Sequence, residues 1–496
     1  MFGESIGSTF SWGGQLFRDR RRWTEIDVQS FAGPGEPTLE SGAQLTYRAD
    51  DVVSNTNAGF FLQEQIAWQD RLFVTGGLRV DGNSAFGDDF GLQPYPKLSL
   101  SYVLSDYDWW PSVAETFKLR AAVGESGKAP DAFDKVRTWT PVSGDDGEPG
   151  FSPLDIGNDE VGPERTREFE GGFDASFFEG RLGLEFTGFH ARTIDALVPV
   201  TYPPSQGFLA TRNENVGELV NKGLEFGLSA GLMRTANFDW QVRFNGTLLE
   251  SEVIDLDDGN PDTTRIYTGL NSYLIEGQPG PVYVQDLVRN PNEFAGPEVT
   301  RDTVLGLVYP NKMLGFGTTL TLFNRLTLDA LAEFQGGHVV QNYTAYQSAR
   351  RGAWHPCIEI QEKLWAFTEE GDASALDDVT ALERARCPYI GQSSVAGQTV
   401  GPSIGFWTEK GDFVKLRYVS LTYDVPQRLI PFAEAASLTL SARNLFTSTD
   451  YTGADPEMTD AADASGNQPG GGEFGRRDYY QIPPARTFLM ALRFTF

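Results

Sequence analysis

The sequence predicts an all-β protein, a transmembrane antiparallel up-and-down β-barrel with short turns at one rim and long loops at the other. Three observations predict this class. Apolar and polar residues alternate along many segments, as in strands with one apolar and one polar face. The connections between these segments alternate between short and long. The composition, with 12% aromatic residues and 54 glycines, favours strands joined by many turns.

The period-two alternation recurs from one end of the chain to the other. It is clearest at residues 72–80, 117–123, 182–187, 325–333 and 438–443. The last strand carries five apolar residues on alternate positions: Phe488, Met490, Leu492, Phe494 and Phe496. We predict that the first four face lipid, that Phe496 lies at the periplasmic interface, and that the five together are the assembly signal of the terminal strand. This strand must be ordered to its end, because an unpaired strand would leave backbone groups unsatisfied in hydrocarbon. No segment predicts a long amphipathic helix.

The lengths of the connections predict which rim of the barrel faces the periplasm and which faces the outside of the cell. Tight turns are expected at 68–71, 178–181, 234–239 and 322–326, and slightly longer ones at 105–115 and 425–436. Long stretches rich in Gly, Pro and Asp occupy 125–162, 196–212, 254–310, 343–402 and 447–483. Short periplasmic turns and long extracellular loops are typical of outer-membrane barrels. A soluble β-rich binding protein or secreted enzyme gives no reason for this asymmetry.

Several functional classes are excluded or disfavoured. The net charge of −28 argues against a nucleic-acid partner, because binding phosphates needs a basic face. No segment approaches the roughly 20 apolar residues of a membrane-spanning helix. No catalytic constellation stands out, and the acidic loop stretches lack the EF-hand register. We therefore predict no enzymatic activity, no metal site and no cofactor.

The two cysteines, Cys357 and Cys387, lie in a polar segment without zinc-type spacing. In an oxidising compartment a disulfide that closes this loop is one interpretation, and two free thiols are the other.

Aromatic residues in the predicted loops are the candidate ligand-binding residues. Sugar rings and peptide side chains stack on flat apolar faces rimmed by hydrogen-bonding groups. The candidates are Trp139, Trp354, Trp365, Trp407, Tyr479 and Tyr480. Packing of the loops against themselves is the alternative interpretation for each of them.

Several stretches, in the same order and over nearly the whole chain, resemble the TonB-dependent outer-membrane receptors, specifically their SusC/RagA-like branch. They include "GFFLQEQIAWQDRLFVTGGLRVDGNSAFG" (59–87), "FKLRAAVGESGKAPD" (117–131), "NVGELVNKGLEFGLSAG" (215–231), "GDFVKLRYVSLTYDVP" (411–426) and "LSARNLFTSTDYTGADPEMT" (440–459). Any one of these stretches alone would be weak evidence for the family. Together they are specific for this family. They establish the architecture of the protein more firmly than the identity of its ligand.

The resemblance implies nutrient uptake across the outer membrane of a Gram-negative-type cell. The implied partners are outer-membrane lipid, a SusD-like surface lipoprotein, the TonB complex, and an oligosaccharide or peptide substrate. Two alternatives remain open at this point. One is a TonB-dependent receptor for a siderophore or cobalamin, and the other is a passive or structural outer-membrane barrel.

The chain also departs from this family. Such receptors usually begin with a signal peptide and a plug domain that fills the barrel, and neither is visible after Met1. We count about 15 strands, against the 22 of plugged outer-membrane transporters. We therefore expect residues 1–496 to be one incomplete barrel domain without a plug domain, with the TonB complex reached through the missing N-terminal part.

Overall fold

The computed structural model describes most of the chain. The described residues are 5–31, 33, 35, 38–144, 147–203, 205, 207–208, 211–256, 264–388, 403–457, 460–461 and 476–496. Contacts group the chain into two compact units. Unit 1 contains Met1–Leu100, Val123–Arg167 and Thr193–Val216, and unit 2 contains Ser101–Ala122, Glu168–Arg192 and Gly217–Phe496.

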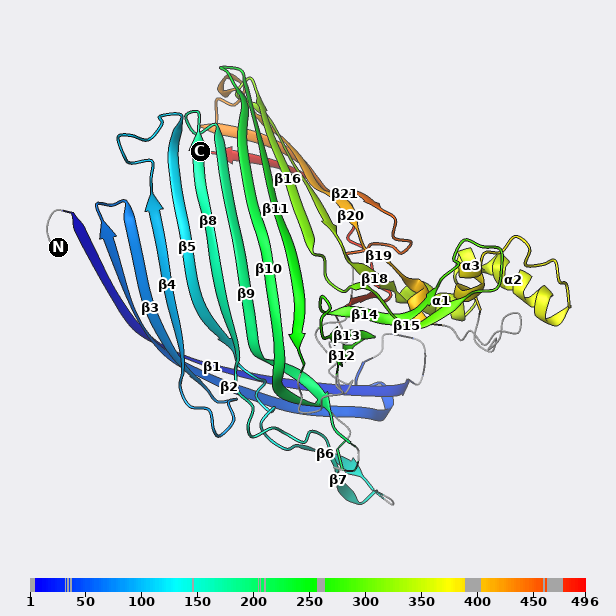
Figure 1. Ribbon diagram of the computed structural model, residues 1–496. Coiled ribbons are helices and arrows are strands. Elements are labelled where there is room, and N and C mark those ends of the chain that lie inside the picture. The colour runs from blue at the N-terminus through cyan, green and yellow to red at the C-terminus, as the bar shows by residue number, and fades with distance from the viewer. Residues whose placement is uncertain are drawn as a thin grey trace. The chain divides into compact units, whose positions relative to one another are not determined.

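Fourteen strands form one large sheet, the main sheet, in the order β1-β2-β3-β4-β5-β8-β9-β10-β11-β16-β17-β20-β21-β24 (Figure 1). Their bounds are β1 (Ile6–Phe31), β2 (Gly42–Trp68), β3 (Leu72–Asn83), β4 (Gln93–Val103), β5 (Ala114–Lys128), β8 (Glu164–Phe177), β9 (Leu182–Thr201), β10 (Thr211–Arg234), β11 (Phe238–Asp255), β16 (Lys312–Leu322), β17 (Leu326–Gly336), β20 (Phe413–Asp424), β21 (Ala435–Thr449) and β24 (Thr487–Thr495). Strand order follows chain order, and pairs such as β1–β2 and β16–β17 are antiparallel. The predicted all-β, up-and-down class is confirmed.

The predicted tight turns join the strands at one rim. β2 pairs with β3 up to Trp68↔Leu72, and β16 pairs with β17 up to Leu322↔Leu326. In the second of these turns Phe323 and Asn324 have φ of 53° and 54°. This left-handed backbone lets the chain reverse within three residues. The long connections lie at the other ends of the strands, as the sequence predicts.

The main sheet has an apolar and a polar face within unit 2. Cross-strand pairing places Leu228, Phe244, Phe316 and Ala332 in one row, so their side chains leave the sheet on the same face. Phe316 in this row is 49% exposed. We call this side the apolar face. Large apolar side chains exposed in this way would be costly in water, which indicates a hydrocarbon environment.

The opposite side of these strands, the polar face, carries charged and hydroxyl groups. A guanidinium nitrogen of Arg243 lies 3.6 Å from the Asp329 carboxylate, which also accepts a 2.6 Å hydrogen bond from Tyr418. The terminal strand β24 shows the same alternation in sequence. Its four predicted lipid-facing residues, and Phe496 just after it, are each at least 37% exposed.

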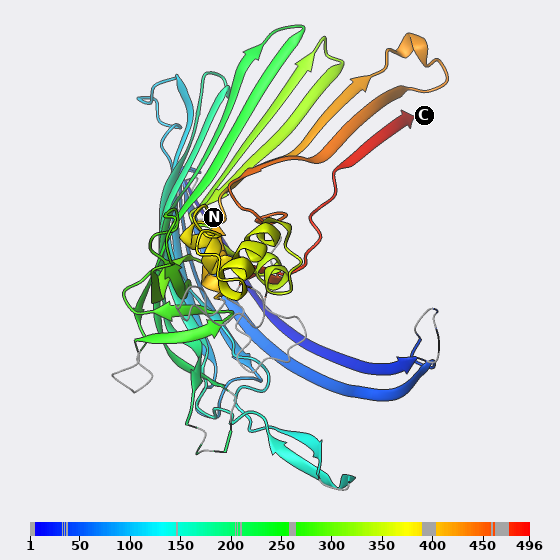
Figure 2. The same cartoon turned by 90° about the vertical axis from the view of Figure 1, so that its right-hand side faces the viewer.

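The main buried cluster of apolar residues lies in the long connection between β17 and β20. Its members come mainly from α1 (Tyr343–Arg350), α2 (His355–Glu369), α3 (Ala381–Arg386) and the 3-10 helix η3 (Ile404–Trp407). We call these four elements the loop subdomain. Figure 2 shows its three α-helices gathered together in yellow. Its core is therefore separate from the apolar face of the main sheet.

Smaller sheets make up the rest of the long loops. One contains β12 (Arg265–Gly269), β13 (Ser272–Ile275), β14 (Val282–Val288) and β15 (Val299–Leu307). A second contains β18 (Val339–Asn342), β19 (Thr408–Lys410), β22 (Asp460–Ala461) and β23 (Arg476–Asp478), and the hairpin of β6 (Trp139–Ser143) and β7 (Pro149–Pro153) forms the third. A short 3-10 helix, η4 (Gln427–Leu429), lies in the β20–β21 turn.

The expectation that no long amphipathic helix occurs was wrong for α2. This helix has 15 residues and buries Cys357, Gln361 and Leu364 on one face. Its buried stripe is short and partly polar, so the sequence pattern is weak, although Pro356 in the first turn is a helix-start signal. In the described part of the chain, no helix combines the length and the apolar character needed to cross a membrane.

Candidate functional site

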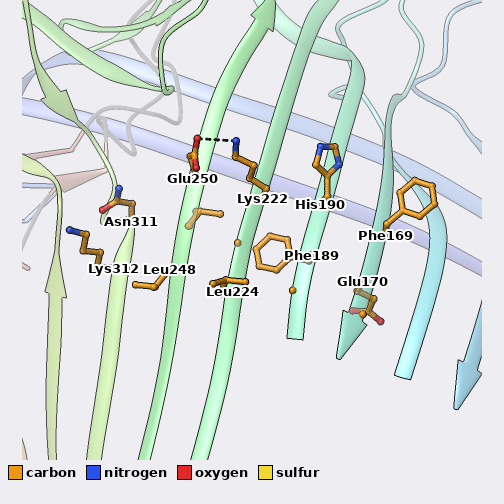
Figure 3. Close-up of a pocket in the computed structure, with 14 residues that line it drawn as sticks. Phe169, Glu170, Phe189, His190, Lys222, Leu224, Leu248, Glu250, Asn311 and Lys312 are labelled. Carbon is orange, nitrogen blue, oxygen red and sulfur yellow. Dashed lines mark ion pairs between the residues drawn. The ribbon is translucent and has the colours of Figure 1, made fainter. Parts of the chain in front are cut away.

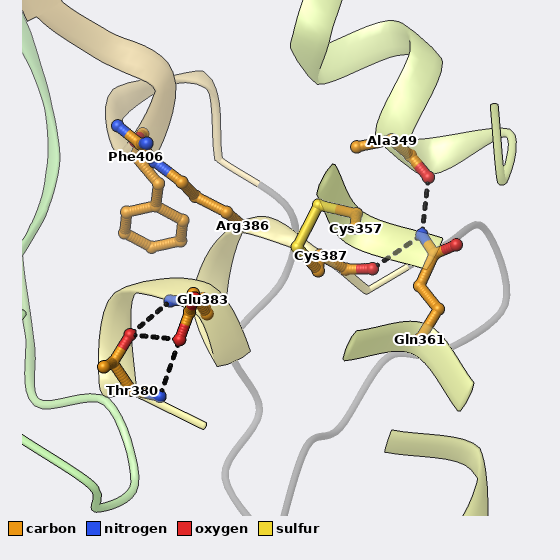
Figure 4. Close-up of a disulfide and its surroundings, with 8 residues drawn as sticks. All are labelled: Ala349, Cys357, Gln361, Thr380, Glu383, Arg386, Cys387 and Phe406. Atoms are coloured by element: carbon orange, nitrogen blue, oxygen red, sulfur yellow. Dashed lines mark hydrogen bonds between the residues drawn. A yellow bond between two sulfur atoms is a disulfide. The ribbon is translucent and has the colours of Figure 1, made fainter. Parts of the chain in front are cut away.

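The loop subdomain is held together by a disulfide and a network of hydrogen bonds (Figure 4). Cys357 and Cys387 are joined with an S–S distance of 2.02 Å, which links α2 to the end of α3. The Gln361 side chain donates 2.8 Å hydrogen bonds to the carbonyl oxygens of Ala349 and Cys387. These contacts tie α1, α2 and α3 into one body that can hold exposed side chains in fixed positions.

A capping box begins α3. The Thr380 hydroxyl accepts a hydrogen bond from the Glu383 backbone, and the Glu383 carboxylate accepts one of 2.9 Å from the Thr380 backbone. This reciprocal pattern satisfies two backbone donors at the start of the helix. It is a sequence signal of a helix start that the sequence analysis did not use.

The predicted tryptophans are placed in three different environments. Trp407 is 4% exposed and packs in the core of the loop subdomain, with the Arg386 guanidinium 4.9 Å from its ring. Trp354 packs edge-on against Trp407 and lies partly buried. Trp365, on α2, is 49% exposed, and Trp139, on β6 in unit 1, is 52% exposed. Only these last two expose a broad aromatic surface, while the burial of Trp407 argues against a ligand contact.

The predicted Tyr479 and Tyr480 belong to a larger cluster that the sequence analysis did not identify. Tyr480, Tyr479, Tyr343 and Tyr346 contact each other in this order, with ring centroids 5.0, 5.1 and 5.4 Å apart. We call these four residues the tyrosine row. Tyr479 is 37% and Tyr480 52% exposed. The row is built from α1 and the residues at and just after β23, which are distant in sequence.

The guanidinium of Arg477 lies against the tyrosine row. Its central carbon is 4.9 Å from the centroid of the Tyr343 ring and 4.8 Å from that of Tyr479. Such cation–π contacts orient a guanidinium while leaving its edge free to donate hydrogen bonds. The sequence analysis did not identify Arg477 as a candidate either. The short sequence "RRDYY" at 476–480 is the one local signal that points to this residue.

A second group of charges, the charge cluster, fixes another loop segment to the main sheet. Its members are Glu333, Lys415, Arg417, Asp455 and Glu457. Arg417 bonds Glu333 at 2.7 Å and makes a two-pronged contact with Glu457 at 2.6 and 2.7 Å. Lys415, 5% exposed, contacts Asp455 at 2.6 Å. Burial by itself would raise the pKa of Glu457, but hydrogen bonds from Arg417 and Lys415 outweigh burial and lower this pKa to about 2.

Hydrogen bonds around Asp478 anchor β23 to α1 and to the segment that follows β21. The Asp478 carboxylate accepts hydrogen bonds of 2.8 Å from the Tyr451 hydroxyl and 2.9 Å from the Thr344 hydroxyl. Burial raises the pKa of Asp478. Its two oxygens are thus engaged by hydroxyl groups, and β23 is held between α1 and the segment that follows β21.

The main sheet carries a concavity of about 800 Å³ in unit 2 (Figure 3). Its lining includes Gly171, Gly188 and Gly223, together with the apolar side chains of Leu224 and Leu248. The Lys222 ammonium and the Glu250 carboxylate form a 2.9 Å ion pair at its edge, as Figure 3 shows. Within the described residues, no group of three or more His, Cys, Asp or Glu side chains is placed to hold a metal ion.

Comparison with known proteins agrees with this architecture. A family model described as "TonB dependent receptor-like, beta-barrel" matches residues 2–355. The chain is 28% identical over 494 residues to TonB-dependent receptor P26 of Formosa agariphila, covering 88% of this chain and 46% of that protein. It is 25% identical over 238 residues to TonB-dependent receptor SusC of Bacteroides thetaiotaomicron, covering 46% of this chain and 24% of that protein.

A solved structure, "Structure of the RagAB peptide transporter", has the same fold. It superposes with a TM-score of 0.76 at 18% sequence identity, covering all of this chain and 54% of that chain. Curated relatives such as TonB-dependent receptor P26 match most of this chain, but the chain spans only about half of their length. Its strands cross the outer membrane, with the apolar face toward lipid. The chain therefore belongs to the TonB-dependent receptor-like β-barrel family.

Proposed function

We propose that this chain is the barrel portion of an outer-membrane receptor that imports nutrients, either oligosaccharides or peptides. The observation that carries the proposal is a disulfide-braced loop subdomain that, with Tyr479 and Tyr480 packed against it, presents exposed aromatic rings at the long-loop end of a family-typical sheet. The likeness to SusC and to a structure titled as a peptide transporter supports the two substrate classes.

The proposal includes partners and domain organisation. Residues 1–496 form part of one barrel domain, and a TonB complex supplies the energy for import. A SusD-like lipoprotein covers the long loops. In this role the chain binds and passes its substrate without breaking bonds in it.

Growth tests the proposal. Cells with and without the gene for this chain are grown on defined oligosaccharides, on peptides, or on a monosaccharide as the only carbon source. Loss of growth on one polymer class, with normal growth on the monosaccharide, supports import. Normal growth of the deletion strain on both polymer classes contradicts it, and a defect restricted to iron-poor medium indicates a siderophore receptor instead.

Trp365 is the first ligand contact to test in this assay. Replacing it by alanine removes an exposed ring from α2 without disturbing the buried face of the helix. A lost aromatic stacking contact should weaken uptake at limiting substrate about threefold to tenfold. The matched control is Trp109→Ala, because Trp109 is 67% exposed in the short β4–β5 turn at the opposite rim. Equal effects of the two substitutions would remove Trp365 from the proposed site.

A further inference from the structure

We propose that Arg477 and the tyrosine row form a binding site for a ligand that carries carboxylate groups. This inference rests on the proposed import function and adds the chemical class of the substrate. The shared chemistry is a carboxylate next to a ring or another flat group, which either an acidic oligosaccharide or an acidic peptide can provide.

The first step is the placement of Arg477 by parallel strand pairing. β18 and β23 pair with Gln341 opposite Arg477 and Asn342 opposite Asp478. Paired residues leave a sheet on the same face, and successive residues alternate. Arg477 and Gln341 therefore share one face, while Asp478 leaves on the other face toward Tyr451. The only carboxylate adjacent to Arg477 in sequence is thus directed away from it.

The second step is the absence of an acceptor for this guanidinium. Among the described residues, Arg477 forms no ion pair, and its Nε is buried without a hydrogen-bond partner. The Nε2 of Gln341, a side chain that is 1% exposed, also lacks an acceptor. Two neighbouring donors without acceptors are rare in folded proteins, because each unmatched buried group is costly. Because these two atoms are buried, a ligand carboxylate would accept hydrogen bonds from the terminal nitrogens of the guanidinium, which have no carboxylate partner among the described residues.

The lack of an internal carboxylate partner distinguishes Arg477 from Arg417. Acidic residues outnumber basic ones by 68 to 40, so carboxylates are abundant in this chain. Arg417 in the charge cluster has two of them. An arginine that stays without one beside exposed tyrosines is the pattern expected of a side chain kept for an external anion.

The third step is the shape of the site. The rings of Tyr343 and Tyr479 both contact the guanidinium, and their centroids lie 5.1 Å from each other and 4.9 and 4.8 Å from its central carbon. Both rings therefore lie on one side of the guanidinium, and its other side remains the donor surface. The exposed rings of Tyr479 and Tyr480 extend the site on one side and can stack against a sugar or peptide group. At the other end of the row the Arg350 guanidinium lies 5.1 Å from the Tyr346 ring. Two guanidinium groups along one row fit an oligomer with repeated carboxylates.

The test is binding of matched probes to the full chain in detergent, measured by calorimetry. One pair is tetragalacturonic acid and its fully methyl-esterified form. The other pair is a pentapeptide of glutamate and a pentapeptide of glutamine, each with blocked ends. We expect the charged member of one pair to bind at least tenfold more tightly than its neutral partner, with affinity that falls as salt rises. The pair that shows this difference identifies the source of the carboxylate.

Variants assign the difference to Arg477. Arg477→Gln should weaken binding of the charged probe about tenfold or more and leave the neutral probe unchanged, because the lost contact is charge-assisted. Arg477→Lys keeps the charge but loses the planar fork, so it should recover part of the affinity. Arg301→Gln, an exposed arginine on β15, is the matched control and should bind like the original chain.

The outcomes separate this inference from the import function. Equal binding of charged and neutral probes by the unsubstituted chain overturns the inference, and this comparison does not depend on how any variant folds. Tighter binding of a neutral probe also overturns it but leaves the import function standing. Failure of the growth experiment, with the carboxylate preference intact, overturns import and leaves a surface site for acidic polymers.

Discussion

Arg417 and Arg477 show how the surroundings of one residue type decide its role. Arg417 is enclosed by the carboxylates of Glu333 and Glu457, so its charge is neutralised inside the protein and serves to fasten a loop. Arg477 instead contacts two tyrosine rings, which hold it without neutralising its charge. At the scale of the residue, the first arginine is structural and the second is proposed as functional.

The charge cluster should make loop stability depend on acid pH. The ordinary pKa of a glutamate, 4.5, applies to the unfolded chain, and the folded chain lowers it to about 2 for Glu457. A lowered carboxylate pKa gives stability that is complete above about pH 4.5 and is lost as the pH falls toward 2. The shift corresponds to roughly 3 kcal/mol. Thermal midpoints of the original chain and of Glu457→Gln should therefore differ at pH 7 and converge near pH 2.

Glu434→Gln provides the control for this measurement, because Glu434 is exposed in the β20–β21 turn. Its thermal midpoint should follow that of the original chain at every pH. A difference between Glu457→Gln and the original chain that stays constant down to pH 2 would show that the carboxylate charge of Glu457 does not hold the loop.

At the scale of the element, the loop subdomain is a small folded body inserted between two main-sheet strands. Its core joins residues of α1, α2, α3 and η3, and its disulfide joins two cysteines that are 30 positions apart in sequence. Few other covalent or packing constraints are available to a loop of this size, since small cores alone supply little stability. The disulfide is therefore expected to contribute much of its rigidity.

Replacing both cysteines by serine should loosen the loop subdomain and leave the main sheet intact. A cross-link that closes a loop of this length stabilises by about 3–4 kcal/mol in the chain-entropy description. Hydrogen exchange should accelerate strongly at residues 355–386 and stay unchanged in β16 and β17. Thr380→Ala removes only the capping box of α3 and should cost about 1 kcal/mol. Equal exchange in the double-serine variant and the original chain would show that packing alone holds these helices.

Sequence reasoning succeeded for elements that local pattern decides. Period-two alternation is a property of each strand, so the main-sheet strands and their tight turns followed from residues such as those at 322–328. The helices of the loop subdomain depend on contacts between distant segments, including the cysteine pair, and their local pattern is short. Burial of Trp407 depends on the same long-range packing. The partners of Arg477 come from β23 and α1, which no local pattern connects.

At the scale of the whole molecule, the two faces of the main sheet are its main energetic feature. The row from Leu228 to Ala332 is apolar, whereas Arg243 and Asp329 lie on the opposite side of the same strands. A barrel in a membrane needs this division, because lipid contacts one face and water the other. The same division explains why the average composition of the chain resembles that of a water-soluble protein.

A pair of arginine substitutions on one strand tests this division directly. Phe316 and Thr319 both lie on β16, Phe316 on the apolar face and Thr319 on the polar face, where its hydroxyl donates a 2.6 Å hydrogen bond to Asp329. Phe316→Arg places a charge near the bilayer midplane, which costs about 2–4 kcal/mol in membrane barrels, whereas Thr319→Arg places it beside an acidic group. Heat-modifiable migration of the protein in outer-membrane fractions should be lost or reduced for Phe316→Arg and retained for Thr319→Arg. Equal tolerance of both substitutions would mean that the apolar face does not contact hydrocarbon, and the membrane orientation of the sheet would have to be abandoned.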